Sequence, residues 1–345
     1  MPVSIYEVAK AAGVSVGSVS RVLNGAPNVG EKTRKRVTEA VDSLGYRPNK
    51  IARSLASGQS MTLAMLVPEL DNPFFGEIAF AVQSEADKTG RVVLIYATND
   101  EPANERGYLK HMLDLQVDGL IIVDSVLDAL EFKALVGSTP VVHIDHLDAP
   151  GGGVVLGADQ AAGAVDAVRH LVGLGHGRIA LITGSSGTEV AAARFRGHCE
   201  SIRDGYAQGL AEAGIAFEPE LIAAGEQLNE VGGHQAAVNL VGRVKFTAVV
   251  AATDLMALGA INALQASGLT VPDDVSVVGY DDIRLAPFIG PGLTTVKFPV
   301  AEVAQRAIEL VTARRRRYRG QIPTELIVRG STAPPRRANR RDRRG

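Results

Sequence analysis

The sequence contains a single cysteine, Cys199, so one chain cannot form an internal disulfide bond. Its N-terminus also lacks the basic, apolar and small-residue succession of a secretory signal. Disulfides are rare in reducing compartments, so both absences favour the cytoplasm.

Long hydrophobic runs are absent as well. No apolar stretch approaches the roughly 20 residues that a membrane-spanning helix needs, so we expect no membrane partner. Hydrophobic residues still make up 46% of the chain, which is ample for buried cores. A length of 345 residues exceeds the usual size of one core and predicts two or three domains.

The sequence also has no constellation of residues typical of catalysis. Neither GxxxxGKS nor GxxxxGKT occurs, Gly151–Gly153 lacks the strand-to-helix context of a dinucleotide loop, and Cys199 has no signature of a nucleophile. His143, Asp145 and His146 are close together, but a strand-end HIDH without further ligands is more often structural than a metal site. We therefore expect no enzymatic activity, no cofactor and no metal ion.

Acidic residues are scarce at both ends of the chain. Residues 1–60 carry nine basic and four acidic side chains, and residues 314–345 carry twelve and two. The whole chain has a net charge of -2. The residues between the two ends include 15 of its 36 basic and 32 of its 38 acidic side chains, so this middle part is acidic. An acidic body is repelled by polyphosphate, so only the basic ends are plausible DNA contacts.

The stretch from Ser4 to Gly25 has the pattern of two short amphipathic helices around a tight turn at Gly13. Ser4 with Glu7 predicts a capping box at the first helix, and Ser15 stands where the second helix begins. This arrangement is a helix-turn-helix signature. In such motifs the second helix enters the major groove of DNA.

The early residues of the second helix are the candidates for base contacts. Arg21 can donate two hydrogen bonds to guanine, Val16 can pack on a thymine methyl, and Gly17 has nothing to offer a base. Base recognition by this helix therefore rests heavily on Arg21. A helical hairpin with a solvated arginine remains the alternative from spacing alone.

A third helix is expected from Glu31 to about Leu44, with four basic residues near its start: Lys32, Arg34, Lys35 and Arg36. Cations at a helix N-terminus oppose the macrodipole, so phosphate is an apt partner, although a solvated charged face fits nearly as well. Residues 45–60 look like a linker with a short helix that Asn49 caps. Leu55 could wedge between base steps there, with an ordinary flexible linker as the alternative.

From Met61 onward, short Val- and Ile-rich runs alternate with helical segments, which predicts an α/β core of two doubly wound lobes. Ligands of such sheets bind beyond the carboxyl ends of the strands. The polar and aromatic residues expected there form a candidate ligand ring: Asp71 to Phe75, Asn99, Asp124, Asp145, Arg194, Thr253 and Asp281.

These motifs together resemble the lac repressor family of transcription regulators. The resemblance covers residues 4 to about 333 and rests on separated motifs in the right order: IYEVAKAAGVSVGSVSRVLN, PNKIARSLASGQS, DNPFF, QVDGLIIV, LGHGRIALITG, TDLMALGA, VPDDVSVVGYDD and LTTV. It implies a homodimer whose paired headpieces and hinge helices grip a palindromic double-stranded operator, with a two-lobed core like that of periplasmic sugar-binding proteins. Effector binding between the lobes would then change operator affinity.

The resemblance also implies site residues. The DNA contacts would be Tyr6, Ser15, Val16, Gly17, Ser18, Ser20, Arg21, Asn24, Asn28, Thr33, Asn49, Ala52 and Leu55. Gly30 stands where relatives often have a helix-capping serine, so that cap is weakened. The effector would be bound by Phe74, Phe75, Asn99, Asp124, Asp145, Arg194, Leu228, Thr253 and Asp281.

Carboxylates with an arginine suit several hydroxyl groups, and aromatic faces suit a sugar's C–H surface, so we expect a small carbohydrate. Leu228 falls where purine- and galactoside-binding relatives carry an aromatic residue, which makes a planar base less attractive. A nucleoside or another metabolite remains the alternative effector. A sugar-binding transport protein is the alternative function, but such a protein should lack residues 1–60.

The expected domains are a headpiece at 1–47, a hinge at 48–60, a core at 61–333 and a disordered basic tail at 334–345. Within the core we expect an N-lobe of about 61–158 and 298–320 and a C-lobe of about 159–297 and 321–333. The tail has no leucine heptad of the kind that makes the lac repressor itself a tetramer, so we expect a dimer.

Overall fold

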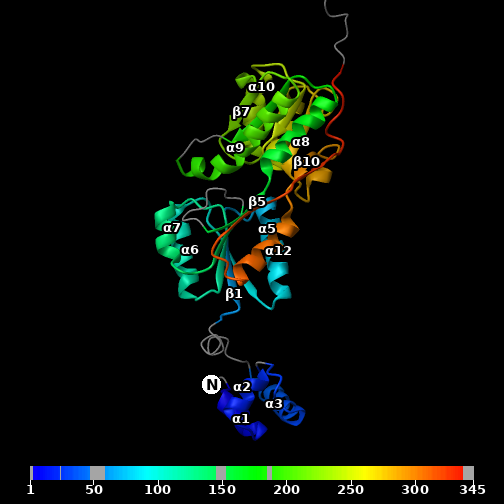
Figure 1. Ribbon diagram of the computed structural model, residues 1–345. Coiled ribbons are helices and arrows are strands. Elements are labelled where there is room, and N and C mark those ends of the chain that lie inside the picture. The colour runs from blue at the N-terminus through cyan, green and yellow to red at the C-terminus, as the bar shows by residue number, and fades with distance from the viewer. Residues whose placement is uncertain (1–2, 24, 47–58, 145–152, 185–188, 337–345) are drawn as a thin grey trace, which may run out of the picture. The chain divides into compact units, whose positions relative to one another are not determined.

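The computed structural model describes residues 3–23, 25–46, 59–144, 153–184 and 189–336, with only the backbone at 189–196. The chain divides into two compact units, 1–61 and 62–345, which are treated separately here (Figure 1). Among the described helices, not one combines the length and the hydropathy that a membrane crossing requires.

The first unit is a bundle of three helices. They are α1 Ile5–Ala12, α2 Val16–Leu23 and α3 Glu31–Leu44. Val8, Val19 and Val37 are fully buried where the three helices meet. The Ser4–Glu7 capping box is confirmed, and Gly30 gives α3 no side-chain cap, as expected. Gly13 ends α1 at φ +61°, a left-handed conformation that favours glycine at this turn.

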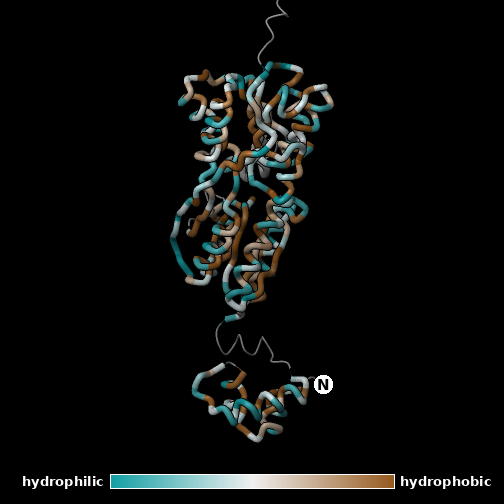
Figure 2. Tube along the Cα trace, turned by 90° about the vertical axis from the view of Figure 1, so that its right-hand side faces the viewer, coloured by the Kyte–Doolittle hydropathy of each residue, from teal (hydrophilic) through white to brown (hydrophobic). Residues whose placement is uncertain are grey.

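The N-lobe is a six-stranded, all-parallel sheet in the order β11-β5-β4-β3-β1-β2. Its strands are β1 Thr62–Val67, β2 Val92–Ala97, β3 Gly119–Val123, β4 Val141–Ile144, β5 Val154–Ala158 and β11 Tyr318–Ile322. Helices α5 Pro73–Lys88 and α12 Val300–Thr312 cover one face, and α6 Pro102–Asp114 and α7 Ala129–Val136 the other (Figure 1). Because both faces are covered, the inner strands are almost wholly hydrophobic (Figure 2).

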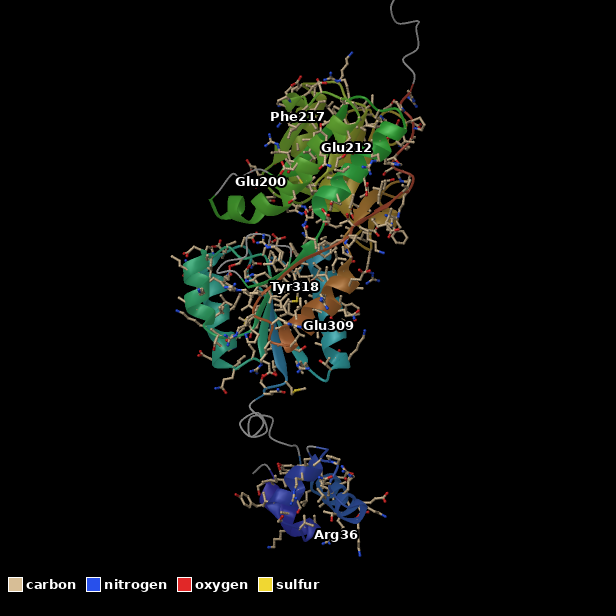
Figure 3. All side chains as sticks on the ribbon, in the orientation of Figure 1. Arg36, Glu200, Glu212, Phe217, Glu309 and Tyr318 are labelled. Atoms are coloured by element: carbon tan, nitrogen blue, oxygen red, sulfur yellow. The ribbon has the colours of Figure 1, made fainter. Side chains whose placement is uncertain are left out.

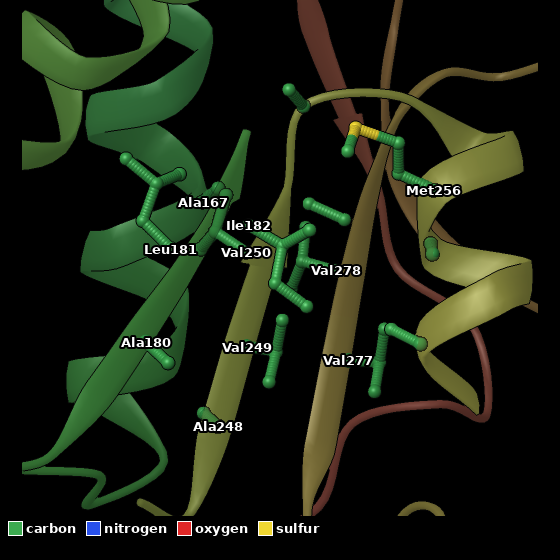
Figure 4. Packing of buried hydrophobic residues seen from close by; sticks show 14 of the residues in the cluster. Ala167, Ala180, Leu181, Ile182, Ala248, Val249, Val250, Met256, Val277 and Val278 are labelled. Carbon is green, nitrogen blue, oxygen red and sulfur yellow. The ribbon is translucent and has the colours of Figure 1, made fainter. Parts of the chain in front are cut away.

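The C-lobe repeats this plan with one antiparallel strand, in the order β12-β10-β9-β8-β6-β7. Its strands are β6 Ile179–Gly184, β7 Ile222–Gly225, β8 Ala248–Ala251, β9 Ser276–Asp281, β10 Thr294–Lys297 and β12 Glu325–Ile327. Its helices are α8 Gln160–Gly173, α9 Glu189–Glu212, α10 Glu230–Val241 and α11 Asp254–Ala266. Leu181, Val250 and Val278 come from adjacent strands and pack in its core (Figure 4).

The chain passes between the two sheets three times, and every crossing is short. β5 leads into α8, β10 leads into α12, and β11 leads into β12. Each crossing leaves a parallel strand at its carboxyl end. The carboxyl edges of the two sheets are therefore the edges at which the lobes are joined.

The long apolar strands and the helices around them are confirmed in both lobes. Sequence periodicity did not single out the short strands β5, β7, β10, β11 and β12. Two observations concern the start of the segment expected to be a tail from residue 334, where Pro334 and Arg336 are exposed. Arg336 forms ion pairs with Asp273 and Asp274, and the buried His176 donates from Nε2 to the carbonyl of Ala333. Residues 337–345 lie outside the described part.

Candidate DNA-binding and effector sites

The second helix of the headpiece presents few hydrogen-bonding groups to solvent. Ser15 caps α2 by accepting from the backbone N–H of Ser18 at 3.2 Å, so its hydroxyl is partly used inside the motif. Val16 is half-buried and packs against the headpiece core. Arg21 is exposed, with Nε 3.2 Å from the carbonyl of Gly17. Arg21 is therefore the residue of α2 best able to donate hydrogen bonds to a base edge.

The basic residues at the start of α3 divide into two pairs. Arg34 donates to the carbonyl of Ala26 at 2.9 Å, and Arg36 donates to the carbonyl of Gly13 at 3.2 Å (Figure 3 labels Arg36). Both arginines therefore hold the headpiece loops in place. Lys32 and Lys35 are exposed, and no bond in the described residues ties down their ammonium groups. They are the stronger candidates for phosphate.

The other expected DNA contacts vary in exposure. Tyr6 is 72% exposed, Asn28 is exposed, and Ser18, Ser20 and Thr33 are half-buried. Asn24, Asn49, Ala52 and Leu55 lie outside the described residues, so the hinge wedge stays a prediction.

The expected effector residues all follow the carboxyl ends of parallel strands. In the N-lobe, Phe74 and Phe75 follow β1, Asn99 follows β2 and Asp124 follows β3. In the C-lobe, Leu228 follows β7, Thr253 follows β8 and Asp281 ends β9. Asp145 and the side chain of Arg194 are outside the described part, after β4 and β6. The topology thus places the residues of the candidate ring on the two edges that the crossings join.

The two phenylalanines occupy different environments. Phe75 is 6% exposed and belongs to the N-lobe core, so it supports the site from within. Phe74 is half-buried and packs against the cores of both lobes, with its ring 5.1 Å from that of Phe298 in the second crossing. Of the pair, only Phe74 is placed to meet a ligand.

Leu228 and Thr253 lie next to each other on the C-lobe edge. Thr253 caps α11 by accepting from the N–H of Met256 at 3.1 Å, and its hydroxyl also lies 3.4 Å from the carbonyl of Leu228. Leu228 packs on the C-lobe core. Thr253 thus has a structural role whether or not it binds a ligand.

Asp281 lies in an unusual turn that a buried carboxylate holds in place. Asp281 and Asp282 have φ values of 111° and 58°, which are uncommon for residues with a side chain. Asp254 accepts from the N–H of Ile283 at 2.9 Å and from the hydroxyl of Thr295 at 2.5 Å. Burial raises the pKa of Asp254 to about 7 against the opposing effect of these two bonds. The sequence did not identify Asp254, although it directly follows Thr253 within TDLMALGA.

The same turn reaches the N-lobe. The backbone N–H of Arg284 donates to a carboxylate oxygen of Glu77 in α5 at 2.8 Å. Partial burial raises the pKa of Glu77, so this carboxylate is sensitive to its surroundings. Arg329 secures the other side of the turn by an ion pair with Asp282 at 2.7 Å. The carboxyl edge of the C-lobe sheet is thus hydrogen-bonded directly to a helix of the N-lobe.

A cavity of about 1170 Å³ lies beside this contact and shares Pro73 with the candidate ring. Glu77, Phe80, Leu285 and Phe288 are among its lining residues, and none of the expected effector residues is. Two residues of the ring cannot be compared with this cavity, because Asp145 and the side chain of Arg194 lie outside the described part of the chain. The effector site at the strand ends therefore stays a prediction, and this cavity is not assigned to it.

Histidine, cysteine and carboxylate side chains do not gather into a metal site anywhere in the described ranges. His143 of the HIDH segment is 2% exposed, and its ring lies 5.1 Å from that of Phe132, as in a core.

Comparisons with known proteins match both parts of the chain. Residues 4–49 match the model of bacterial regulatory proteins of the lacI family, and residues 168–332 match the periplasmic binding protein-like domain. The HTH-type transcriptional regulator DegA of Bacillus subtilis is 34% identical and covers 97% of this chain and 99% of its own. The HTH-type transcriptional regulator GalR of Escherichia coli is 34% identical over 90% of this chain and 88% of its own.

Solved structures agree with these relatives. The lac repressor dimer bound to operator and the anti-inducer ONPF has a TM-score of 0.83 and 30% identity, covering 96% of this chain and all of that chain. The complex of the transcriptional regulator CelR with cellobiose has a TM-score of 0.67 and 29% identity, covering 95% and 99%. The chain therefore belongs to the lacI family of bacterial regulatory proteins and is a DNA-binding transcription regulator with a periplasmic-binding-protein-like core.

Proposed function

We propose that this regulator is a repressor that binds a palindromic operator as a homodimer and responds to a small carbohydrate held between its lobes. The observation that carries the proposal is that the candidate ring residues follow strands on the carboxyl edges of both sheets. At these edges the hydrogen bond from Arg284 to Glu77 joins the two lobes. We also propose the domain division expected from the sequence: headpiece 1–47, hinge 48–60, core 61–333 and tail 334–345. A repressor of this kind works on DNA in the cytoplasm and needs no catalytic group.

Exposed hydrophobic residues support a dimer. Phe80 is 74% exposed, Phe288 is 81% exposed and Leu285 is 51% exposed, and all three line the cavity beside the Glu77–Arg284 bond. Grouped exposed aromatics commonly mark a protein interface. The lac repressor in the structure described above is itself a dimer. Light scattering should therefore give the mass of two chains, and a mass of four would contradict the proposal.

The operator is identified by selecting palindromic duplexes from a randomised library with the full-length protein. Failure of the folded dimer to retain any palindrome at low salt would refute operator binding. Once the operator is identified, titrating operator DNA with the protein in the presence and absence of effector decides whether the ligand is an inducer or a corepressor.

Arg21→Ala should cost about 1 to 3 kcal/mol of discrimination at one base pair of each half-site, because Arg21 is the main hydrogen-bond donor on α2. Lys35→Ala is the matched control, since an exposed lysine near phosphate should weaken binding to all duplexes alike. Competition between the operator, its point variants and random DNA measures both effects. Equal losses on operator and random DNA for Arg21→Ala would contradict a base contact.

Asp281→Asn should weaken the response to effector by roughly 10- to 150-fold, because one charge-assisted hydrogen bond contributes about 1.5 to 3 kcal/mol. Operator binding without effector should stay unchanged. Asp204→Asn, which removes an exposed carboxylate from α9 of the same lobe, is the control. An unaltered effector midpoint in Asp281→Asn would remove this residue from the site.

The effector class is tested by a thermal-shift screen of monosaccharides, disaccharides and nucleosides on the full-length protein. A ligand that binds only the folded state at 100 times its Kd adds about 2.7 kcal/mol to stability, which such a screen detects. Stabilisation by a sugar supports the proposal. Stabilisation by nucleosides alone would replace the carbohydrate with the alternative effector.

A further inference from the structure

The N-lobe carries an exposed cluster of arginines that its role in effector binding does not use. Arg314, Arg315, Arg316 and Arg317 follow the last turn of α12 and precede β11, and all four are exposed. None of them forms an ion pair with any residue in the described part of the chain. We call these four residues the arginine cluster.

Strand register fixes where the cluster lies. Tyr318 of β11 pairs with Val154 of β5, and the same row continues through Val142, Ile121 and Met65. All these strands are parallel, so their first residues lie on one edge of the sheet. The arginine cluster is therefore on the amino edge of the N-lobe sheet, opposite to the effector edge. Thr62, where the chain enters the core from the headpiece, is on that same edge.

The distance along this edge is short. β11 is four strands from β1 in the sheet order, and neighbouring strands are about 4.8 Å apart, so the cluster lies roughly 19 Å from Thr62. The chain from residue 47 to residue 61 can extend at most about 50 Å. DNA held by the headpiece is thus within reach of this edge.

Stabilisation of the C-terminal end of α12 explains only one or two of the four arginines. A cation or two at the end of α12 would be favourable with the helix dipole. Four adjacent exposed arginines repel one another, and residues 313–320 contain no acidic residue to offset them. Lys133 and the first three arginines also border a hollow of about 730 Å³ with Ser138 and Thr139. Among the acidic residues near this edge, Glu309 of α12 forms an ion pair with Arg306, and Asp114 and Asp118 lie next to β3.

We propose that the arginine cluster binds backbone phosphates of the DNA that flanks the operator. The proposal rests on the proposed operator binding and adds a second contact, from the core, which reads no sequence. An arginine guanidinium pairs with phosphate in a bidentate manner, and each neutralised phosphate steepens the salt dependence of binding by about 0.9. Flanking DNA should therefore raise the affinity of the full-length dimer.

The test compares the selected palindrome alone with the same palindrome extended by ten arbitrary base pairs on each side. The variants are Arg315→Gln with Arg316→Gln and, as control, Arg203→Gln with Lys245→Gln, which removes two exposed charges from the C-lobe. The wild type and the control should bind the longer duplex on the order of tenfold more tightly at low salt. The arginine variant should lose this gain and show a salt slope shallower by up to about 3.6, because the dimer loses four arginines at about 0.9 each.

The outcomes distinguish operator binding by the headpiece from phosphate binding by the arginine cluster. Binding of the short palindrome by all three proteins supports operator recognition by the headpiece whatever the flanks do. An arginine variant that keeps the full gain from the flanks would overturn the phosphate contact. Equal loss of the gain in the control would also overturn it, because net charge alone would then explain the effect. A wild type that binds no palindrome would refute the proposed function itself.

Discussion

Gly259→Ala is expected to destabilise the C-lobe by about 2 kcal/mol, although alanine is the better helix former. A Cβ at this position of α11 would lie 1.9 Å from the backbone carbonyl oxygen of Glu230 in α10. Because the obstacle is backbone, the two helices must move apart, and overpacking of this kind costs about 1 to 3 kcal/mol or more. The helix propensity gained by alanine offsets only about 1 kcal/mol.

The same substitution at Gly107 is the matched control. Gly107 also lies inside a helix, α6, but a Cβ there would meet nothing within 4 Å. Gly107→Ala should therefore stabilise the protein by up to about 1 kcal/mol. Urea unfolding followed by circular dichroism measures both changes. Similar stabilities for the two variants would mean that α10 and α11 adjust without cost.

The sequence predicted most of the fold because its strongest patterns are local. The capping box, the turn at Gly13 and the buried Val- and Ile-rich strands each depend on neighbouring residues, and all are found in the structure. The short strands at the sheet edges were missed. β11 alternates polar and apolar residues over only five positions, and its pairing with β5 depends on residues far away in sequence.

The sequence predicted the candidate effector residues from their positions after the strands. It did not predict the hydrogen bonds that hold the turn around Asp281 in place. Asp145 and Arg194 stay predictions, as do the hinge residues. Glu77 and Asp254 are ordinary acidic residues in their helices, and only the tertiary structure brings them to the turn at Asp282–Arg284. Arg34 and Arg36 show the reverse case. Their charges suggested DNA phosphate, but their partners within the headpiece are carbonyl groups from distant loops.

Asp254 should make the stability of the C-lobe fall as pH rises from about 4 to about 7. Its pKa is about 7 in the folded protein and 3.8 as an ordinary aspartate, mainly because burial disfavours the charged form. Between these values the folded state keeps a proton that the unfolded chain has lost, so the folded state is favoured at the acid end. A difference of about three pKa units corresponds to a loss on the order of 4 kcal/mol across this range.

Asp254→Asn should remove this dependence, because an amide neither gains nor loses the proton. Its oxygen can still accept from the N–H of Ile283 and its NH2 can donate to Thr295, so the turn that holds Asp281 should remain. The measurement is the free energy of unfolding at several pH values, with Asp273→Asn, which removes an exposed carboxylate, as control. Parallel pH profiles for wild type and Asp254→Asn would show that Asp254 stays charged in the fold. If the profiles diverge, the charge on Asp254 acts on the same turn that presents Asp281, and effector affinity should change over the same pH range.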